Sequence, residues 1–170
     1  SQFGDLALIL VIINYARLFI DFGFTIKGPV LFNESEKNDK SLIHDISNIL
    51  FTKIIISFFV LLILLGVSIF IDIQILTVFL IVFLFAFNMN HYFNYKEKSK
   101  ITTIISLFEK GQFLCLIYFY LNEQNYFNDY LLFLLLSSCI GAILSLYFVS
   151  KEEKTNIFQI VIPKTKPNII

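Results

Sequence analysis

The sequence predicts an all-α protein, a polytopic bundle of transmembrane helices. Of its 170 residues, 57% are hydrophobic, and its mean hydropathy of +0.78 is far above that of a soluble domain. Apolar runs long enough to cross a bilayer alternate with short polar segments. We expect a bundle over residues 1–150 and a basic cytoplasmic tail or linker over residues 151–170. The five predicted spans cover about 6–24, 42–71, 75–92, 101–121 and 130–149.

Arg17 and Asp21 interrupt the first apolar run. A charged side chain near the bilayer centre costs about 2.5–3.5 kcal/mol, so such residues usually face protein or a wet cavity. Because they are four residues apart, both lie on one helix face, and Asn14 falls on the same stripe. Two interpretations stay open: a structural ion pair between Arg17 and Asp21, or two residues that line a transport cavity.

The sequence also predicts where the first span ends and how the second span begins. Gly28 and Pro29 are expected to end the first span, and a polar loop is expected to follow over residues 30–40. The second span is longer than the hydrocarbon core of about 30 Å, so its first turns are expected to project from it. For Lys53 we favour snorkelling to the cytoplasmic interface over contact with a substrate.

The remaining spans add charged and small residues. A very short turn predicts that the second and third spans are antiparallel neighbours. In the fourth span, Glu109 and Lys110 are adjacent at mid-depth and diverge by about 100°, so at most one points squarely into a lumen, and we favour Lys110. The fifth span carries small side chains that permit close helix contact: Ser137, Ser138, Gly141 and Ser145.

No enzyme motif, metal site or cofactor site is predicted. Cys115 and Cys139 lie in apolar runs without zinc-ligand spacing, and we expect both to be buried thiols. His44 and His91 have no ligand partners at suitable spacing and are expected to be polar interfacial residues. With 13 basic and 13 acidic residues, the formal net charge is zero, and no global field favours a nucleic-acid partner.

The distribution of lysine predicts the orientation in the membrane. Lysines follow the first, third and fifth spans, whereas the two other connections have none. By the positive-inside rule the lysine-bearing segments are cytoplasmic and Ser1 emerges outside. Since the chain starts at Ser1 without a charged signal-peptide region, we expect that one span precedes it.

Several short segments resemble the N-terminal part of the bacterial polysaccharide-transport flippases, which translocate O-antigen and other lipid-linked oligosaccharides. The most specific is the run Asp21-Phe22-Gly23-Phe24. The others are Phe3-Gly4, Asn14-Tyr15, Asn48-Ile49-Leu50 and Lys53. Where the family commonly has a Trp-Phe-Phe-Gln-Gly type of segment, this chain has residues 91–95, His-Tyr-Phe-Asn-Tyr, and so departs from the pattern.

The resemblance implies the fold of the multidrug/oligosaccharidyl-lipid/polysaccharide exporters, two helical lobes around a central cavity. This chain would form most of one lobe, with the second lobe elsewhere in the same protein. The implied function is to flip undecaprenyl-diphosphate-linked oligosaccharides across the bacterial cytoplasmic membrane, with membrane lipids as surroundings. Two alternatives are a membrane polysaccharide polymerase and a non-transporting helical subunit. The residues expected to line the lumen are Asn14, Arg17, Asp21, Lys53, Glu109 and Lys110.

Overall fold

The chain forms a bundle of helices that is built to cross a membrane. The computed structural model describes residues 2–21, 23–37, 42–68, 75–121 and 126–161. Within these ranges every regular element is helical, which confirms the predicted all-α class. Five helical segments among the described residues are long and apolar enough to span a bilayer: Gly4–Glu36, Leu42–Gly66, Leu76–Tyr95, Ser99–Tyr120 and Tyr126–Glu152. The chain is therefore a membrane protein.

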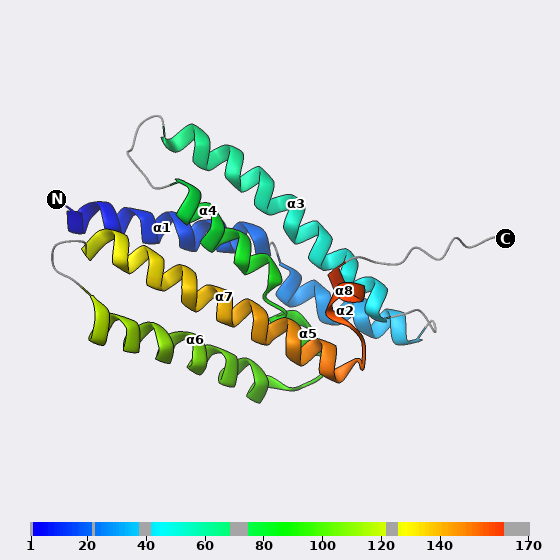
Figure 1. The fold of residues 1–170 in the computed structure, drawn as a ribbon. Coiled ribbons are helices and arrows are strands. Elements are labelled where there is room, and N and C mark those ends of the chain that lie inside the picture. The colour runs from blue at the N-terminus through cyan, green and yellow to red at the C-terminus, as the bar shows by residue number, and fades with distance from the viewer. Residues whose placement is uncertain (1, 22, 38–41, 69–74, 122–125, 162–170) are drawn as a thin grey trace.

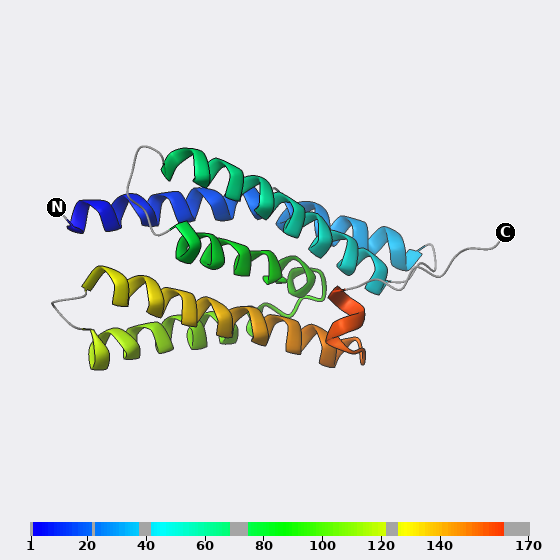
Figure 2. The same cartoon turned by 45° about the horizontal axis from the view of Figure 1, so that its top comes forward.

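The spans lie side by side in roughly parallel and antiparallel directions (Figures 1 and 2). α3 (Leu42–Ser68) packs against α1 (Gln2–Asp21) and α4 (Ile75–Leu84). The contact of α3 with α4 agrees with the prediction that the second and third spans are neighbours. On the opposite side of α4, α7 (Tyr126–Glu152) packs against α6 (Ser99–Tyr120). α4 is thus central, while α6 lies at the edge of the bundle (Figure 2).

Two apolar clusters fill the described part of the bundle, one toward each end. The first includes Ile13 of α1, Ile81 of α4 and Leu131 of α7. The second includes Leu50 of α3 and Val149 of α7. Ile54 and Phe87 pack against both clusters, so the clusters meet at one level of the bundle. The polar side chains described below lie near that level.

The first span is broken at Gly23, which agrees with its predicted bound at about residue 24 but lies before the break expected at Gly28 and Pro29. Gly23 has a φ of +78°, which glycine adopts without the strain that a Cβ would add. The chain then continues as α2 (Phe24–Lys37), through Gly28 and Pro29. The predicted end at Gly28 and Pro29 and the predicted loop from residue 30 are therefore wrong. Packing of α2 against α5 and α3 outweighs the one backbone hydrogen bond that Pro29 cannot donate.

The third span is also broken, which the sequence analysis did not predict. α4 is followed by the 3₁₀ turn η1 (Phe85–Phe87), by Asn88 in an extended conformation, and by the short α5 (Asn90–Tyr95). Asn88 has a φ of −73° and a ψ of 119°, so the helical hydrogen-bond pattern stops there. This break leaves backbone groups that other parts of the bundle must satisfy.

The end of the described chain is more ordered than the predicted linker. α8 (Ile157–Val161) packs against α3 and α7, and Ile160 is fully buried. Likewise, the segment 126–129, which was predicted to be loop, begins α7. Residues 69–74, 122–125 and 162–170, which contain the predicted outer turns and the proline-rich part of the tail, lie outside the described residues.

Candidate functional site: a buried lysine and a cationic hollow

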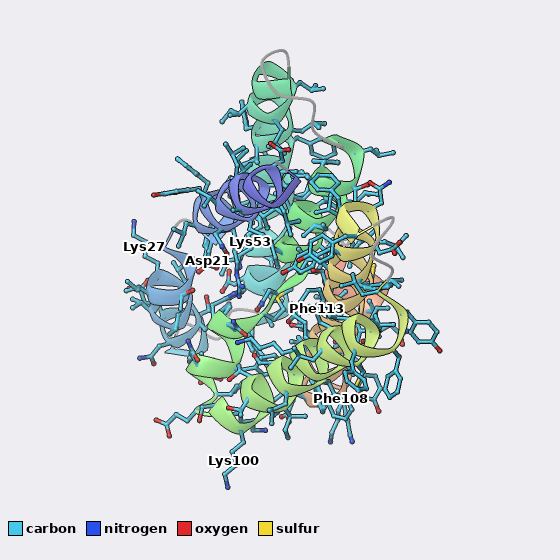
Figure 3. The ribbon with its side chains drawn as sticks, turned by 90° about the vertical axis from the view of Figure 1, so that its left-hand side faces the viewer. Asp21, Lys27, Lys53, Lys100, Phe108 and Phe113 are labelled. Carbon is cyan, nitrogen blue, oxygen red and sulfur yellow. The ribbon has the colours of Figure 1, made fainter. Side chains whose placement is uncertain are left out.

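Lys53 is the buried cation at the centre of the site. It belongs to α3, and only 2% of its side chain is exposed. Its ammonium donates one hydrogen bond to Asp21 Oδ1 at 3.0 Å and another to the backbone carbonyl of Asn88 at 3.2 Å. Figure 3 shows Asp21 and Lys53 close together inside the bundle, whereas Lys27 points outward. The expectation that Lys53 snorkels to the interface is wrong, because its acceptors lie within the protein.

We refer to Lys53, the Asp21 carboxylate and the Asn88 carbonyl as the Lys53 bridge. Asp21 is the last residue of α1, and its second carboxylate oxygen accepts a hydrogen bond from the hydroxyl of Thr25 in α2. The Lys53 ammonium also lies 5.8 Å from the ring centroid of Phe24, the first residue of α2. One ammonium therefore contacts both helix breaks, the one at Gly23 and the one at Asn88.

Two further backbone N–H groups at the break in the third span have hydrogen-bond partners. The Met89 N–H donates to Ser145 Oγ of α7 at 2.9 Å, and the Asn90 N–H donates to Asn88 Oδ1 at 3.1 Å. Backbone polar groups at membrane depth need such partners, because lipid supplies none. Ser145 lies on the predicted small-residue stripe of α7, whose four members are all buried, as expected for close helix contact.

Arg17 is exposed on α1, and its guanidinium lies 4.9 Å from the ring centroid of Phe85. It makes no salt bridge with any residue that the structure describes. Of the two interpretations left open, the ion pair between Arg17 and Asp21 does not form; Asp21 instead binds Lys53 and Thr25. Arg17 is thus a cation without an acidic partner among the described side chains.

A small cavity of about 100 Å³ opens beside Arg17. We call it the Arg17 hollow, and its lining residues are Arg17, Leu18, Asp21, Phe85, Asn88 and Asn90. Arg17 and Asp21 are its charged lining residues; Lys53 binds Asp21 beside it, and Glu109 of α6 lies within electrostatic reach of Arg17. Asn14 is exposed one turn before Arg17 on the same face of α1 but does not line this hollow. The arrangement suits a small anionic group held by a guanidinium and side-chain amides.

The two charged residues of α6 face different surroundings. Glu109 is half-buried, and its Oε2 would lie 3.0 Å from a Cβ built on Gly141 of α7. Lys110 is exposed. Arg17 is close enough to act electrostatically on Glu109. Of these two neighbours, Glu109 therefore points into the bundle, contrary to the preference for Lys110.

A larger groove, of about 630 Å³, lies between α2 and α5. It is lined by residues that include Pro29, Asn33, Glu36, Tyr95 and Lys96. Lys96 pairs with Glu36 at 3.2 Å, so the two charges offset each other within the groove. Nearby pairs join Lys96 to Glu153 and Lys98 to Glu152. We interpret this region as a polar belt that ties helix ends together, and we place the candidate site at the Arg17 hollow.

The histidines and cysteines depart from their predicted surroundings. Cys115 is exposed and Cys139 is only partly buried, so the expectation of two buried thiols is wrong. His44 is exposed, whereas His91 is fully buried inside the bundle. No group of three His, Cys, Asp or Glu side chains that could hold a metal ion occurs among the described residues.

Sequence reasoning missed several residues of the site. Thr25 binds Asp21 of the bridge, Phe85, Asn88 and Asn90 line the hollow, and Ser145 binds the Met89 N–H at the break. The sequence signal for this region is the polar pair Asn88 and Asn90, which interrupts the third apolar run.

No protein-family model, no curated protein and no solved structure matches this chain. The functional argument therefore rests on the geometry of the site and on the sequence resemblance given above.

Proposed function

We propose that this protein flips undecaprenyl-diphosphate-linked oligosaccharides across the bacterial cytoplasmic membrane and that the chain forms most of one lobe of a two-lobe exporter. The observation that carries the proposal is Arg17, an exposed cation without an acidic partner, at a hollow in an apolar helical bundle. A cation at such a position is costly in lipid and is typical of a substrate pathway.

The chemistry of the hollow favours a diphosphate as the recognised group. The guanidinium fork matches phosphate oxygens, and the side chains of Asn88 and Asn90 offer amide donors beside it. Asp21 lines the same hollow, but it forms its salt bridge with Lys53 and none with Arg17. With a volume of about 100 Å³, the hollow has room for a phosphate group and not for a chain of sugars.

Recognition of the diphosphate leaves the oligosaccharide outside the Arg17 hollow. The sugars would then lie against the exposed polar face that includes Asn14, and the lipid tail against exposed apolar helix surfaces. The second lobe of the same protein would close the other side of this pathway. No bond is made or broken in such a step, in keeping with a transporter.

For the orientation, we propose that the end carrying α2, α5 and α8 is cytoplasmic. Lys96 and Lys98 follow α5 and Lys100 is in the first turn of α6, while Lys151 is in the last turn of α7 and Lys154 comes just after it. The end of α5 and the end of α7 lie at the same end of the bundle as α2 and α8 (Figure 1). The positive-inside rule assigns such an end to the cytosol. In a variant with Cys115 and Cys139 replaced by Ser, an impermeant maleimide added outside should label Asp5→Cys and leave Lys100→Cys unlabelled. The reverse pattern would contradict the orientation.

Arg17 variants of the full protein test the function. With Arg17→Gln, surface polysaccharide should be lost at normal membrane abundance, because the cation for the diphosphate is gone. Arg17→Lys should retain part of the transport, since the charge remains without the bidentate fork. Lys27→Gln removes an exposed cation that points away from the site and is the matched control (Figure 3). Normal polysaccharide from Arg17→Gln would refute the proposal.

A further inference from the structure

His91 is a fully buried side chain without a hydrogen-bond partner. It belongs to α5, its relative exposure is 0%, and neither ring nitrogen has a partner among the described residues. Buried polar groups are normally hydrogen-bonded, so an imidazole with two unpaired nitrogens requires an explanation. Neither the Lys53 bridge nor the Arg17 hollow uses this side chain.

α2 covers the imidazole by close contact. A Cβ on Gly28 would lie 3.0 Å from His91 Cβ and 3.2 Å from His91 Cδ2, so the two helices touch at this point. On the same side of the ring, Phe32 stacks at a centroid distance of 5.9 Å. Water reaches the ring nitrogens only if α2 and α5 separate there.

The charged groups around His91 come from α1, α2, α3 and the segment after α7. Lys53 of α3 and Asp21 of α1 act on it electrostatically, while they bind each other. On α2, Lys27 is exposed and Glu36 pairs with Lys96; just after α7, Glu153 accepts a hydrogen bond from Tyr92. In the packed state, a charged imidazole would lose its hydration and lie near the Lys53 ammonium. Both effects disfavour the charged form.

We propose that His91 is a proton-binding site whose occupancy is coupled to separation of α2 from α5. The packed arrangement holds the imidazole neutral, and the separated arrangement lets water and a proton reach it. By linkage, a proton that binds only the separated state shifts the population toward that state. Acidification through the ordinary range of histidine therefore loosens the α2–α5 contact, and a return to neutral pH restores it.

This coupling goes beyond the proposed transport function and does not depend on it. α5 begins two residues after Asn88, so its displacement also acts on the Lys53 bridge. Proton binding at His91 is thus a means to control the break in the third span, whatever the protein carries.

A tryptophan at position 32 tests the inference, because the 170 residues contain none. In Phe32→Trp, the indole would take the place of the ring that stacks on His91. On acidification from about pH 8 to about pH 5 in lipid nanodiscs, its emission should shift to longer wavelength and weaken. The same variant with His91→Gln should show no such shift. Phe58→Trp, at an exposed position away from His91, is the control for general effects of acid.

An equal shift with and without His91, or no shift in Phe32→Trp, would overturn the proposal. If Phe32→Trp does not fold, histidine NMR of the unsubstituted protein replaces it. His44 and His91 are the two histidines of these residues, and exposed His44 is the internal reference. The His91 signal should titrate together with shifts at the neighbouring Tyr95. An His91 signal that titrates without any change at Tyr95 would also overturn the coupling.

Discussion

The third and fourth spans differ in the continuity of their helices and in their burial. The third is broken at Asn88 and lies in the centre of the bundle, where 44% of an apolar stretch of 18 residues is buried. The fourth, α6, is an unbroken helix at the edge, and only 6% of its corresponding 18-residue stretch is buried. The break in the third span is thus found where neighbouring side chains donate and accept hydrogen bonds, while the helix of the exposed span is unbroken.

This difference distinguishes buried charges that stabilise the fold from exposed charges that a ligand, lipid or protein can reach. Lys53 is buried and fully engaged at the broken span, so its charge stabilises the fold. Arg17 and Lys110 are exposed and make no salt bridge with described residues, so their charges are free for a ligand, lipid or protein. Three cations that look alike in the sequence therefore have different roles.

Removal of the buried cation should have the largest effect. Lys53→Met leaves the Asp21 carboxylate and the Asn88 carbonyl without their shared donor, and we expect a loss of about 3–5 kcal/mol in the free energy of unfolding. Lys110→Met makes the same chemical change on exposed α6 and should alter it by less than about 0.5 kcal/mol. Denaturant titration of both variants in bicelles measures the difference.

A second substitution sharpens this result. Lys53→Met combined with Asp21→Asn removes both charges, so part of the lost stability should return, although the Asn88 carbonyl stays unpaired. Equal effects of Lys53→Met and Lys110→Met would show that the buried position does not matter.

Loss of the Ser145 hydroxyl should have an intermediate effect. Ser145→Ala leaves the Met89 N–H unpaired inside the bundle, which should destabilise the fold by about 1–3 kcal/mol. Ser106→Ala on the exposed face of α6 is the matched control and should change stability by less than about 0.5 kcal/mol. Thermal unfolding of the purified proteins compares them, and a neutral Ser145→Ala would argue against a role for α7 at the break.

Two glycines provide a contrast in the sign of the effect. Gly28→Ala places a Cβ 3.0 Å from His91 Cβ, and such overpacking typically costs about 1–3 kcal/mol. A Cβ on Gly111 of α6 meets nothing within 4 Å, and Gly111→Ala should stabilise the helix by about 0.5–1 kcal/mol. Opposite shifts in unfolding temperature are therefore expected, and shifts of the same sign would contradict the close contact of α2 with α5.

The sequence predicted the spans well because a run of apolar residues determines insertion locally. It also singled out Arg17, Asp21 and Lys53, which do gather near one level of the bundle. The pairing of Asp21 with Arg17, one of the two interpretations left open, is wrong, because helix periodicity reveals only neighbours on the same helix. Lys53, which binds it, is 32 residues away.

The break in the third span shows a second limit of prediction. Asn88 and Asn90 interrupt an apolar run, but whether a helix stops there depends on hydrogen bonds from distant side chains. Ser145 lies 56 residues from Met89, and Lys53 lies 35 residues from Asn88. Such tertiary partners leave no periodic pattern in the sequence.

The central claim is that one ammonium, that of Lys53, supports both helix breaks. Hydrogen exchange of the protein in nanodiscs, followed over residues 23–27 and 88–93, tests it most directly. Lys53→Met should accelerate exchange in both segments, whereas Ser145→Ala should accelerate it only in the second. If Lys53→Met leaves either segment as protected as in the unsubstituted protein, the Lys53 bridge does not couple the two breaks.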